Sequence, residues 1–186
     1  MSNIYTGKGD LGFTLLPRRK NKISKSDLVF DVLGTFDELN SCLGFLHSAR
    51  VPDIRKVSVE VQKDLLGLGA IISLDEKITD EMTQKWEVRI KELEEVIDYF
   101  DSRNNKLEHF ILPGGCRESS FLHLSRAVCR RLERLVIYYL RRNKDKGFVI
   151  VYLNRLSDLL FVLARYSNKK LGFEDIIWNN KHSLRL

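Results

Sequence analysis

The chain has 186 residues, of which 44% are hydrophobic and 30% charged, and this balance is typical of a globular protein with a sizeable core. We find no apolar run near the ~20 residues that a membrane-spanning helix needs, and no signal or transit pattern at the N-terminus. The sequence therefore predicts a single domain over residues 1–186, located in the cytoplasm, with no membrane as a partner.

The net charge is +6, from 31 Lys and Arg against 25 Asp and Glu. A positive excess favours anionic partners, which include nucleic acid, a membrane surface and a small molecule that carries phosphate. A nucleic-acid-binding helical protein is therefore one class to consider. Because no basic–aromatic interleaving or nucleic-acid motif supports that class, we expect no nucleic acid as a partner.

Apolar residues recur at steps of three and four in five segments, which is the pattern of amphipathic helices. The segments cover residues 32–46, 54–68, 82–100, 121–139 and 149–163. Thr79 precedes Asp80 and Glu81, as at a capped helix start. We therefore expect an all-α five-helix bundle over 27–171, and no alternating run is long enough for a competing strand. Residues 1–26 are an N-terminal loop with a basic, mobile connector at 17–26, and residues 172–186 are an irregular tail.

The N-terminal stretch TGKGDLGFT, residues 6–14, contains three glycines and two threonines around Asp10. Glycine-rich backbone is entropically costly to order, so this stretch is not a helix. Two interpretations remain open from these residues alone. The stretch is either a frayed terminus or a loop whose backbone amides bind an anion.

The fourth segment carries Arg126, Arg130 and Arg134 at four-residue spacing, so the three guanidinium groups project from one stripe, with Glu133 close by. A salt-bridged outer face would explain any single arginine. For the whole stripe we favour anion binding, because stacked guanidinium groups need a carboxylate or phosphate partner.

Three further features stand out among the predicted helices. Asn154 is a poor helix former within an apolar helix, so its amide needs a partner, either a neighbouring helix or a ligand. Asp37 follows the core position Phe36, which suggests a buried or interfacial carboxylate paired with a helix-four arginine. The loop FILPGG, residues 110–115, is unusually apolar and either plugs the bundle end or forms one wall of a pocket.

Several kinds of chemistry have no matching pattern in the sequence. The three cysteines are widely spaced without a C-x-x-C pair, and the four histidines lack metal-ligand spacing. Neither a Walker-type phosphate loop nor a nucleophile motif is present. We therefore expect no metal bound by protein side chains alone, and catalysis by positioning and electrostatics.

Five motifs together resemble the PduO-type ATP:cob(I)alamin adenosyltransferases. They occur in the family order and spread over most of the chain, at 6–14, 34–40, 110–115, 126–134 and 154–161. The resemblance implies a five-helix bundle that assembles as a homotrimer with sites between subunits. It implies transfer of the 5′-deoxyadenosyl group of ATP to cob(I)alamin, with Mg²⁺ on the phosphates, giving adenosylcobalamin and triphosphate. It also implies a reductase and an adenosylcobalamin-dependent enzyme as partners.

The resemblance assigns roles to individual residues. In the catalytic set, Arg130 acts at the nucleotide, Asp37 pairs with Arg126 across the subunit interface, and Phe110 lies against the corrin and displaces its lower ligand. The implied ATP-binding residues are Thr6, Gly7, Lys8, Gly9, Asp10, Gly12, Thr14, Lys25, Arg130, Glu133, Arg134 and Asn154.

One position departs from the family pattern, because Gly7 stands where the family usually has Lys or Arg. Lys8 compensates if the loop path shifts by one residue, and Lys8→Ala would then lower ATP affinity. The departure also supports an alternative, in which the chain is a catalytically weak ATP- and corrinoid-binding bundle for cofactor delivery or sensing.

Overall fold

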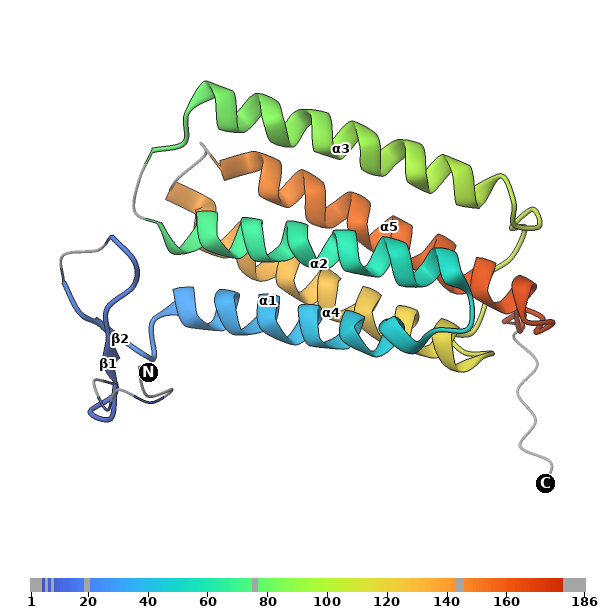
Figure 1. Cartoon of the computed structure of the whole chain (residues 1–186), viewed down its shortest axis with the longest axis horizontal. Coiled ribbons are helices and arrows are strands. Elements are labelled where there is room, and N and C mark those ends of the chain that lie inside the picture. Colours follow the sequence, from blue (N-terminus) through green and yellow to red (C-terminus); the bar gives the residue numbers. More distant parts are fainter. Residues whose placement is uncertain are drawn as a thin grey trace.

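The computed structural model describes residues 5, 7, 9–18, 21–74, 77–142 and 146–178. Five long helices lie side by side (Figure 1), which confirms the predicted all-α bundle. Their bounds are α1 Leu28–Gly44, α2 Pro52–Ser73, α3 Asp80–Asp101, α4 Arg117–Tyr139 and α5 Gly147–Lys170. Short 3₁₀ turns follow α1 at Phe45–Ser48 (η1) and α4 at Leu140–Arg142 (η2).

Four of the five helices begin at a side chain that accepts a hydrogen bond from a free N–H group of the first turn, or at a proline, which has no N–H group. The predicted cap is confirmed, since Thr79 Oγ1 accepts a hydrogen bond from Met82 N at 3.2 Å. Asp27 caps α1 in the same manner, and α2 begins at Pro52, whose missing N–H costs nothing there. Cys116 caps α4 through its sulfur, which accepts from Ser119 N at 3.4 Å.

The central helix is α5, which packs most extensively against α4 and α3. By length and apolar composition α5 would suffice to cross a bilayer, a property that our search for apolar runs missed. In this fold its apolar side chains form the core instead, and Tyr152, Leu153 and Leu156 are fully buried. A core helix surrounded by others is expected to be apolar on most sides.

Two buried polar contacts fix how the helices meet. Glu118, at the start of α4, accepts hydrogen bonds from Arg50 N, Nε and Nη2 at 3.0–3.1 Å. Inside the bundle, Asp64 on α2 accepts from Tyr152 Oη at 2.7 Å and from Arg89 Nε at 2.8 Å. All three cysteines are free, as their spacing predicts.

Two segments that the sequence left irregular contain short backbone pairings. The connector predicted at 17–26 contains a strand, β2 (Ile23–Ser24), which pairs antiparallel with β1 (Phe13–Thr14). The tail is likewise not irregular throughout, because Ile177 forms a bridge with Ile111 in the loop between α3 and α4. Both pairings join segments that are too short to show an alternating pattern.

Candidate functional site

The glycine-rich loop lies beside the start of α1 and is closed by turns (Figure 1). Gly12 N donates to Gly9 O at 3.2 Å, and Lys25 N donates to Gly12 O at 2.8 Å. Gly7 has φ +67°, where a lysine such as the family usually carries would be strained. The β1–β2 ladder therefore returns the chain to the loop and fixes its base.

Lys25 is brought to the loop, as the resemblance implies. A Cβ on Gly9 would lie 2.9 Å from Lys25 Nζ, so the ammonium rests directly on the loop backbone. Only glycine leaves room for this approach. Asp10 and Gly12 are exposed and Thr14 is half-buried in β1, whereas Thr6 and Lys8 lie outside the described residues.

The arginine stripe on α4 divides into two environments. Arg130 and Arg134 are exposed to solvent, and Arg134 Nη1 donates to the carbonyl oxygen of Arg130 at 3.1 Å. Arg126 is half-buried, with its guanidinium carbon 5.4 Å from the ring centre of Phe161 on α5. Two guanidinium groups are thus available to an anion, and the third is turned into an aromatic contact.

A pair of unsatisfied nitrogens accompanies Arg126. Arg126 Nε and His123 Nε2 are both buried and have no hydrogen-bond partner among the described residues. Burial lowers the pKa of His123, and the charge of Arg126 lowers it further. Buried polar groups in native proteins are almost always paired, so these two nitrogens are exceptions within the described part of the chain.

Asn154 finds its partner on the neighbouring helix. Its Nδ2 donates to Glu133 Oε1 on α4 at 3.0 Å, and its Oδ1 accepts from Arg155 Nη1 at 2.8 Å. Of the two partners left open by the sequence, the neighbouring helix is the one present. The structure therefore joins Glu133 and Asn154, two of the predicted nucleotide residues, in a single contact between α4 and α5.

Asp37 is exposed within one chain, so of the two predicted alternatives, buried or interfacial, only the interfacial one remains a prediction. The buried face of α1 passes through Val32, Phe36 and Leu39, and one residue beyond Phe36 the helix has turned by about 100° toward solvent. Asp37 makes no hydrogen bond or ion pair with another described residue, whereas its neighbour Glu38 pairs with Arg131 on α4. Within one chain, the arginine of α4 that pairs with an acidic residue of α1 is thus Arg131.

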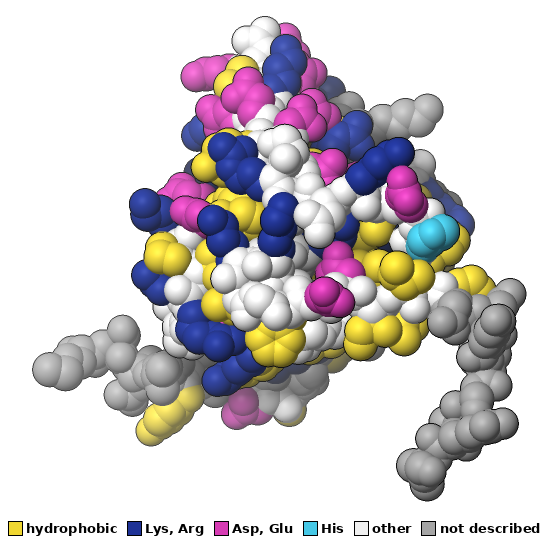
Figure 2. Space-filling view, turned by 90° about the vertical axis from the view of Figure 1, so that its right-hand side faces the viewer, with side chains coloured by type: hydrophobic (Ala, Val, Ile, Leu, Met, Phe, Trp, Pro, Cys, Tyr) yellow, Lys and Arg dark blue, Asp and Glu magenta, His cyan; other side chains and the backbone are white. Residues whose placement is uncertain are grey.

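Phe110 stands in the open at the other end of the bundle. Its side chain is 81% exposed, and its ring lies edge to face with Trp178 at 6.5 Å between centres. A hollow of about 490 Å³ lies between these rings and residues 107–109. Figure 2 views this end, where hydrophobic side chains emerge among charged ones. Phe110 therefore forms a wall rather than a plug.

The tail holds the Phe110 segment by backbone hydrogen bonds. Trp178 N donates to Phe110 O, and Leu112 N donates to Ile176 O, both at 2.8 Å. Asp175, just before this pairing, is bound by Arg165 Nε at 2.8 Å and by Asn168 Nδ2 at 3.1 Å. The last turns of α5 thus anchor the tail, and the tail aligns Phe110.

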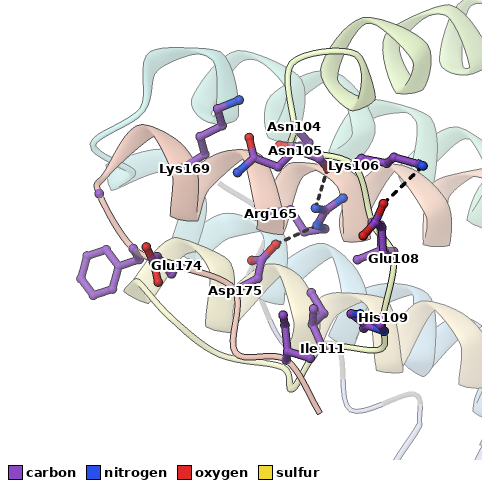
Figure 3. Close-up of a pocket in the computed structure, with 14 residues that line it drawn as sticks. Asn104, Asn105, Lys106, Glu108, His109, Ile111, Arg165, Lys169, Glu174 and Asp175 are labelled. Carbon is purple, nitrogen blue, oxygen red and sulfur yellow. Dashed lines mark hydrogen bonds and ion pairs between the residues drawn. The ribbon is translucent and has the colours of Figure 1, made fainter. Parts of the chain in front are cut away.

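A pocket of about 520 Å³ lies beside this anchor, between residues 104–111 and 172–177 (Figure 3). Arg165 is 6% exposed and donates to Asn105 O as well as to Asp175, as the dashed lines in Figure 3 show. Lys106 pairs with Glu108 across the rim at 3.3 Å. Three Lys or Arg and three Asp or Glu side chains line the pocket, so its lining favours neither an anion nor a cation.

Sequence reasoning missed Arg155, Asp175 and Trp178. Arg155 lies in the motif at residues 154–161, directly after Asn154, so its position beside Asn154 was an available signal. Asp175 and Trp178 lie in a segment without periodicity, and their contacts span 7 to 68 positions of sequence. Contacts of that kind are not visible in local patterns.

The two halves of the predicted site lie at opposite ends of the bundle within one chain. Phe45, just after α1, stacks on Phe121 near the start of α4 at 4.6 Å between ring centres. The start of α4, and with it the Phe110 loop, is therefore beside the end of α1, whereas the glycine-rich loop is at its start (Figure 1). Seventeen helical residues separate these ends by about 25 Å.

The bundle, the arginine stripe on α4 and the asparagine on α5 define a helical adenosyltransferase. Residues 4–167 match the cobalamin adenosyltransferase family, and the chain belongs to this family. The corrinoid adenosyltransferase MMAB of Mus musculus is 37% identical over 188 residues, covering 97% of this chain and 78% of the relative. The corrinoid adenosyltransferase of Citrobacter freundii is 38% identical over 167 residues, covering 89% and 94%.

A solved structure has the same fold. It is a variant of the PduO-type ATP:corrinoid adenosyltransferase from Lactobacillus reuteri, complexed with cobalamin and ATP. The superposition gives a TM-score of 0.82 at 30% identity and covers 96% of this chain and 100% of that one. The family suggested by the five motifs is thereby confirmed.

Proposed function

We propose that this chain transfers the 5′-deoxyadenosyl group of ATP to cob(I)alamin, giving adenosylcobalamin and triphosphate. The observation that carries the proposal is the cluster on α4 and α5, where exposed Arg130 and Arg134 adjoin the Glu133–Asn154 contact. Two free guanidinium groups beside an oriented amide suit a polyphosphate that must be held in one position.

The reaction needs no base from the protein. The electron pair of cob(I)alamin attacks C5′ of ATP, the cobalt–carbon bond forms, and the bond from C5′ to the triphosphate oxygen breaks with its electrons on the leaving group. The protein's share is to align the two substrates and to stabilise the charge that grows on triphosphate. Arg130 and Arg134 supply that charge stabilisation, and the amides and Lys25 of the loop hold the phosphates.

The active site is shared between subunits of a homotrimer. The glycine-rich loop and Phe110 of one chain lie about 25 Å apart along α1, too far to serve one ATP and one corrin. Arg126 and His123 have buried nitrogens that lack a partner among the described residues, and the exposed carboxylate of Asp37 makes no hydrogen bond or ion pair with them. Asp37 of a second copy would satisfy Arg126, as the resemblance implies.

Loop residues support the same assembly. Leu11 is 91% exposed, and Phe13 and Leu15 are also exposed on the described part of the loop. Apolar side chains gathered on a projecting loop are typical of a surface that another chain or a ligand covers. We infer that the neighbouring subunit and its bound ATP cover them.

Magnesium fits the residues present as an ion held mainly by phosphate. Glu133 uses Oε1 for Asn154, which leaves Oε2 as a hard oxygen donor, and the described residues contain no group of three metal-ligating side chains. Mg²⁺ in such sites is typically bound by one or two carboxylates and the substrate phosphates. When bound, it would neutralise phosphate charge.

At the other end of the site, Phe110 is placed to meet the corrin. Its exposed ring, with Trp178 and the hollow beside them, offers a flat apolar surface that displaces the lower cobalt ligand. Loss of that ligand leaves a four-coordinate cobalt that is easier to reduce. A reductase would supply the electron that reduces the cobalt, and an adenosylcobalamin-dependent enzyme would use the product, adenosylcobalamin.

The test is spectroscopic. Cobalamin is reduced to the Co(I) state without oxygen, protein, ATP and Mg²⁺ are added, and the absorbance of adenosylcobalamin is followed. We expect turnover that requires both ATP and protein. Binding of ATP and cobalamin without product would instead favour a delivery or sensing protein, the alternative that Gly7 suggests.

A further inference from the structure

A network of three hydrogen bonds joins α3, α5 and α4 and ends at the proposed nucleotide site. Glu94 Oε1 on α3 accepts from Arg155 Nε on α5 at 2.7 Å. Arg155 Nη1 donates to Asn154 Oδ1 at 2.8 Å, and Asn154 Nδ2 donates to Glu133 Oε1 on α4 at 3.0 Å. These residues are half-buried, and Glu94 is the member farthest from the arginine stripe.

The hydrogen bonds of this network can run from donor to acceptor in only one way. Arginine can only donate and an ionised carboxylate can only accept, so the amide between them must turn its oxygen to Arg155 and its nitrogen to Glu133. The free N–H of Asn154 and the free oxygen of Glu133 are then fixed as well. An amide with no such neighbours flips between two orientations of nearly equal energy.

Glu94 also gives Arg155 a carboxylate partner of its own. Without Glu94, the nearest carboxylate to Arg155 in this set is Glu133, one hydrogen-bonded step away through Asn154. An arginine prefers a carboxylate to a neutral amide, because charged acceptors form stronger hydrogen bonds. Arg155 would then leave Asn154 and compete for the carboxylate that faces the nucleotide.

We propose that Glu94, on a helix outside the predicted site, is a positioning residue for ATP, because it holds Arg155 against Asn154 and thereby orients the Asn154–Glu133 pair. This inference rests on the proposed function, in which that pair binds the nucleotide. Glu94 touches neither substrate and acts only through Arg155.

The main experiment measures ATP affinity by titration calorimetry on the full chain, so that it does not depend on turnover. Glu94→Ala is expected to weaken ATP binding about three- to tenfold, as for loss of a charge-assisted contact at a partly exposed site. Glu94→Gln, which keeps an acceptor oxygen, is expected to lie between Glu94→Ala and wild type. Glu95→Ala is the matched control, because Glu95 is the next residue on α3 and is exposed.

A second background separates positioning from general stability. In an Asn154→Ala chain, Glu94→Ala should change ATP affinity by less than it does in wild type, because the amide that it orients is gone. Equal affinities for Glu94→Ala and Glu95→Ala, or the same loss with and without Asn154, would overturn the inference. Wild-type ATP binding without adenosylcobalamin formation would contradict the proposed function and leave this test intact.

Discussion

Gly115 and Asn168 are in such close contact that only glycine fits. Gly115 has φ +103°, and a Cβ there would lie 2.2 Å from Asn168 Oδ1. Asn168 is 2% exposed and holds both sides of this turn, accepting from Cys116 N at 2.9 Å and donating to Gly114 O at 3.1 Å. The turn that follows Phe110 is thus set by one buried amide on α5.

Gly115→Ala is therefore expected to destabilise the protein by about 2 kcal/mol or more, from backbone strain and displacement of a buried hydrogen-bonded group. Gly114→Ala is the matched control, since a Cβ there would meet nothing within 4 Å. Chemical denaturation measures both variants. Equal stability of the two would show that Asn168 moves aside without cost.

Acid should loosen the start of α4. Three hydrogen bonds from Arg50 lower the pKa of Glu118 to about 2, below the ordinary value for glutamate. A carboxyl whose pKa is lowered by folding adds stability above its ordinary pKa of about 4.3, and that stability disappears as the pH falls toward 2. Glu118→Gln should be less stable than wild type at pH 7, and the difference should shrink between about pH 4.3 and pH 2.

Thermal unfolding across that pH range checks this prediction. Glu108→Gln is a suitable control, because Glu108 is exposed and, within the described part of the chain, forms its ion pair with Lys106 at the surface. Such surface pairs contribute about 1 kcal/mol or less. A constant difference between Glu118→Gln and wild type at all pH values would mean that the ion pair with Arg50 is not what titrates.

Phe110→Ala should reduce adenosylcobalamin formation by about tenfold or more while ATP affinity stays unchanged, because the ring meets the corrin and not the nucleotide. Val88→Ala serves as the control, since Val88 is an apolar side chain that is 57% exposed on α3 and does not line this hollow. Steady-state kinetics and ATP titration are the measurements. A change in ATP affinity without a change in turnover would contradict the proposal that Phe110 contacts the corrin and not the nucleotide.

Arg130→Ala should abolish turnover and leave the assembly intact, because Arg130 is exposed on α4 and its loss removes positive charge without opening the core. Arg126→Ala should behave differently and weaken assembly or corrin handling, since its guanidinium packs on Phe161. Activity and sedimentation together distinguish the two. Substantial activity in Arg130→Ala would remove it from the catalytic set.

The helices were predictable because each repeats its own apolar period locally, and α3 could be placed even at its cap, Thr79. The position of Arg130 and Arg134 on one exposed stripe of α4 was predictable for the same reason. What the pattern could not supply was pairing between distant segments. The Ile111–Ile177 bridge involves one residue on each side, and Glu94 reaches Asn154 only through an arginine on another helix. For Asp37 the sequence left burial and an interface open, because adjacency to a core position on a helix does not imply burial.

The central proposal, that each active site is shared between subunits, is tested most directly for the loop of one chain and Arg130 of another, by mixing two inactive variants. One chain lacks residues 1–12 and the other carries Arg130→Ala; the two are unfolded together, refolded and assayed for adenosylcobalamin. In random trimers with shared sites, about a quarter of sites combine an intact loop with an intact Arg130, so we expect about a quarter of wild-type activity. No activity in the mixture, with trimers present, would contradict the account, because each chain would then build its own site.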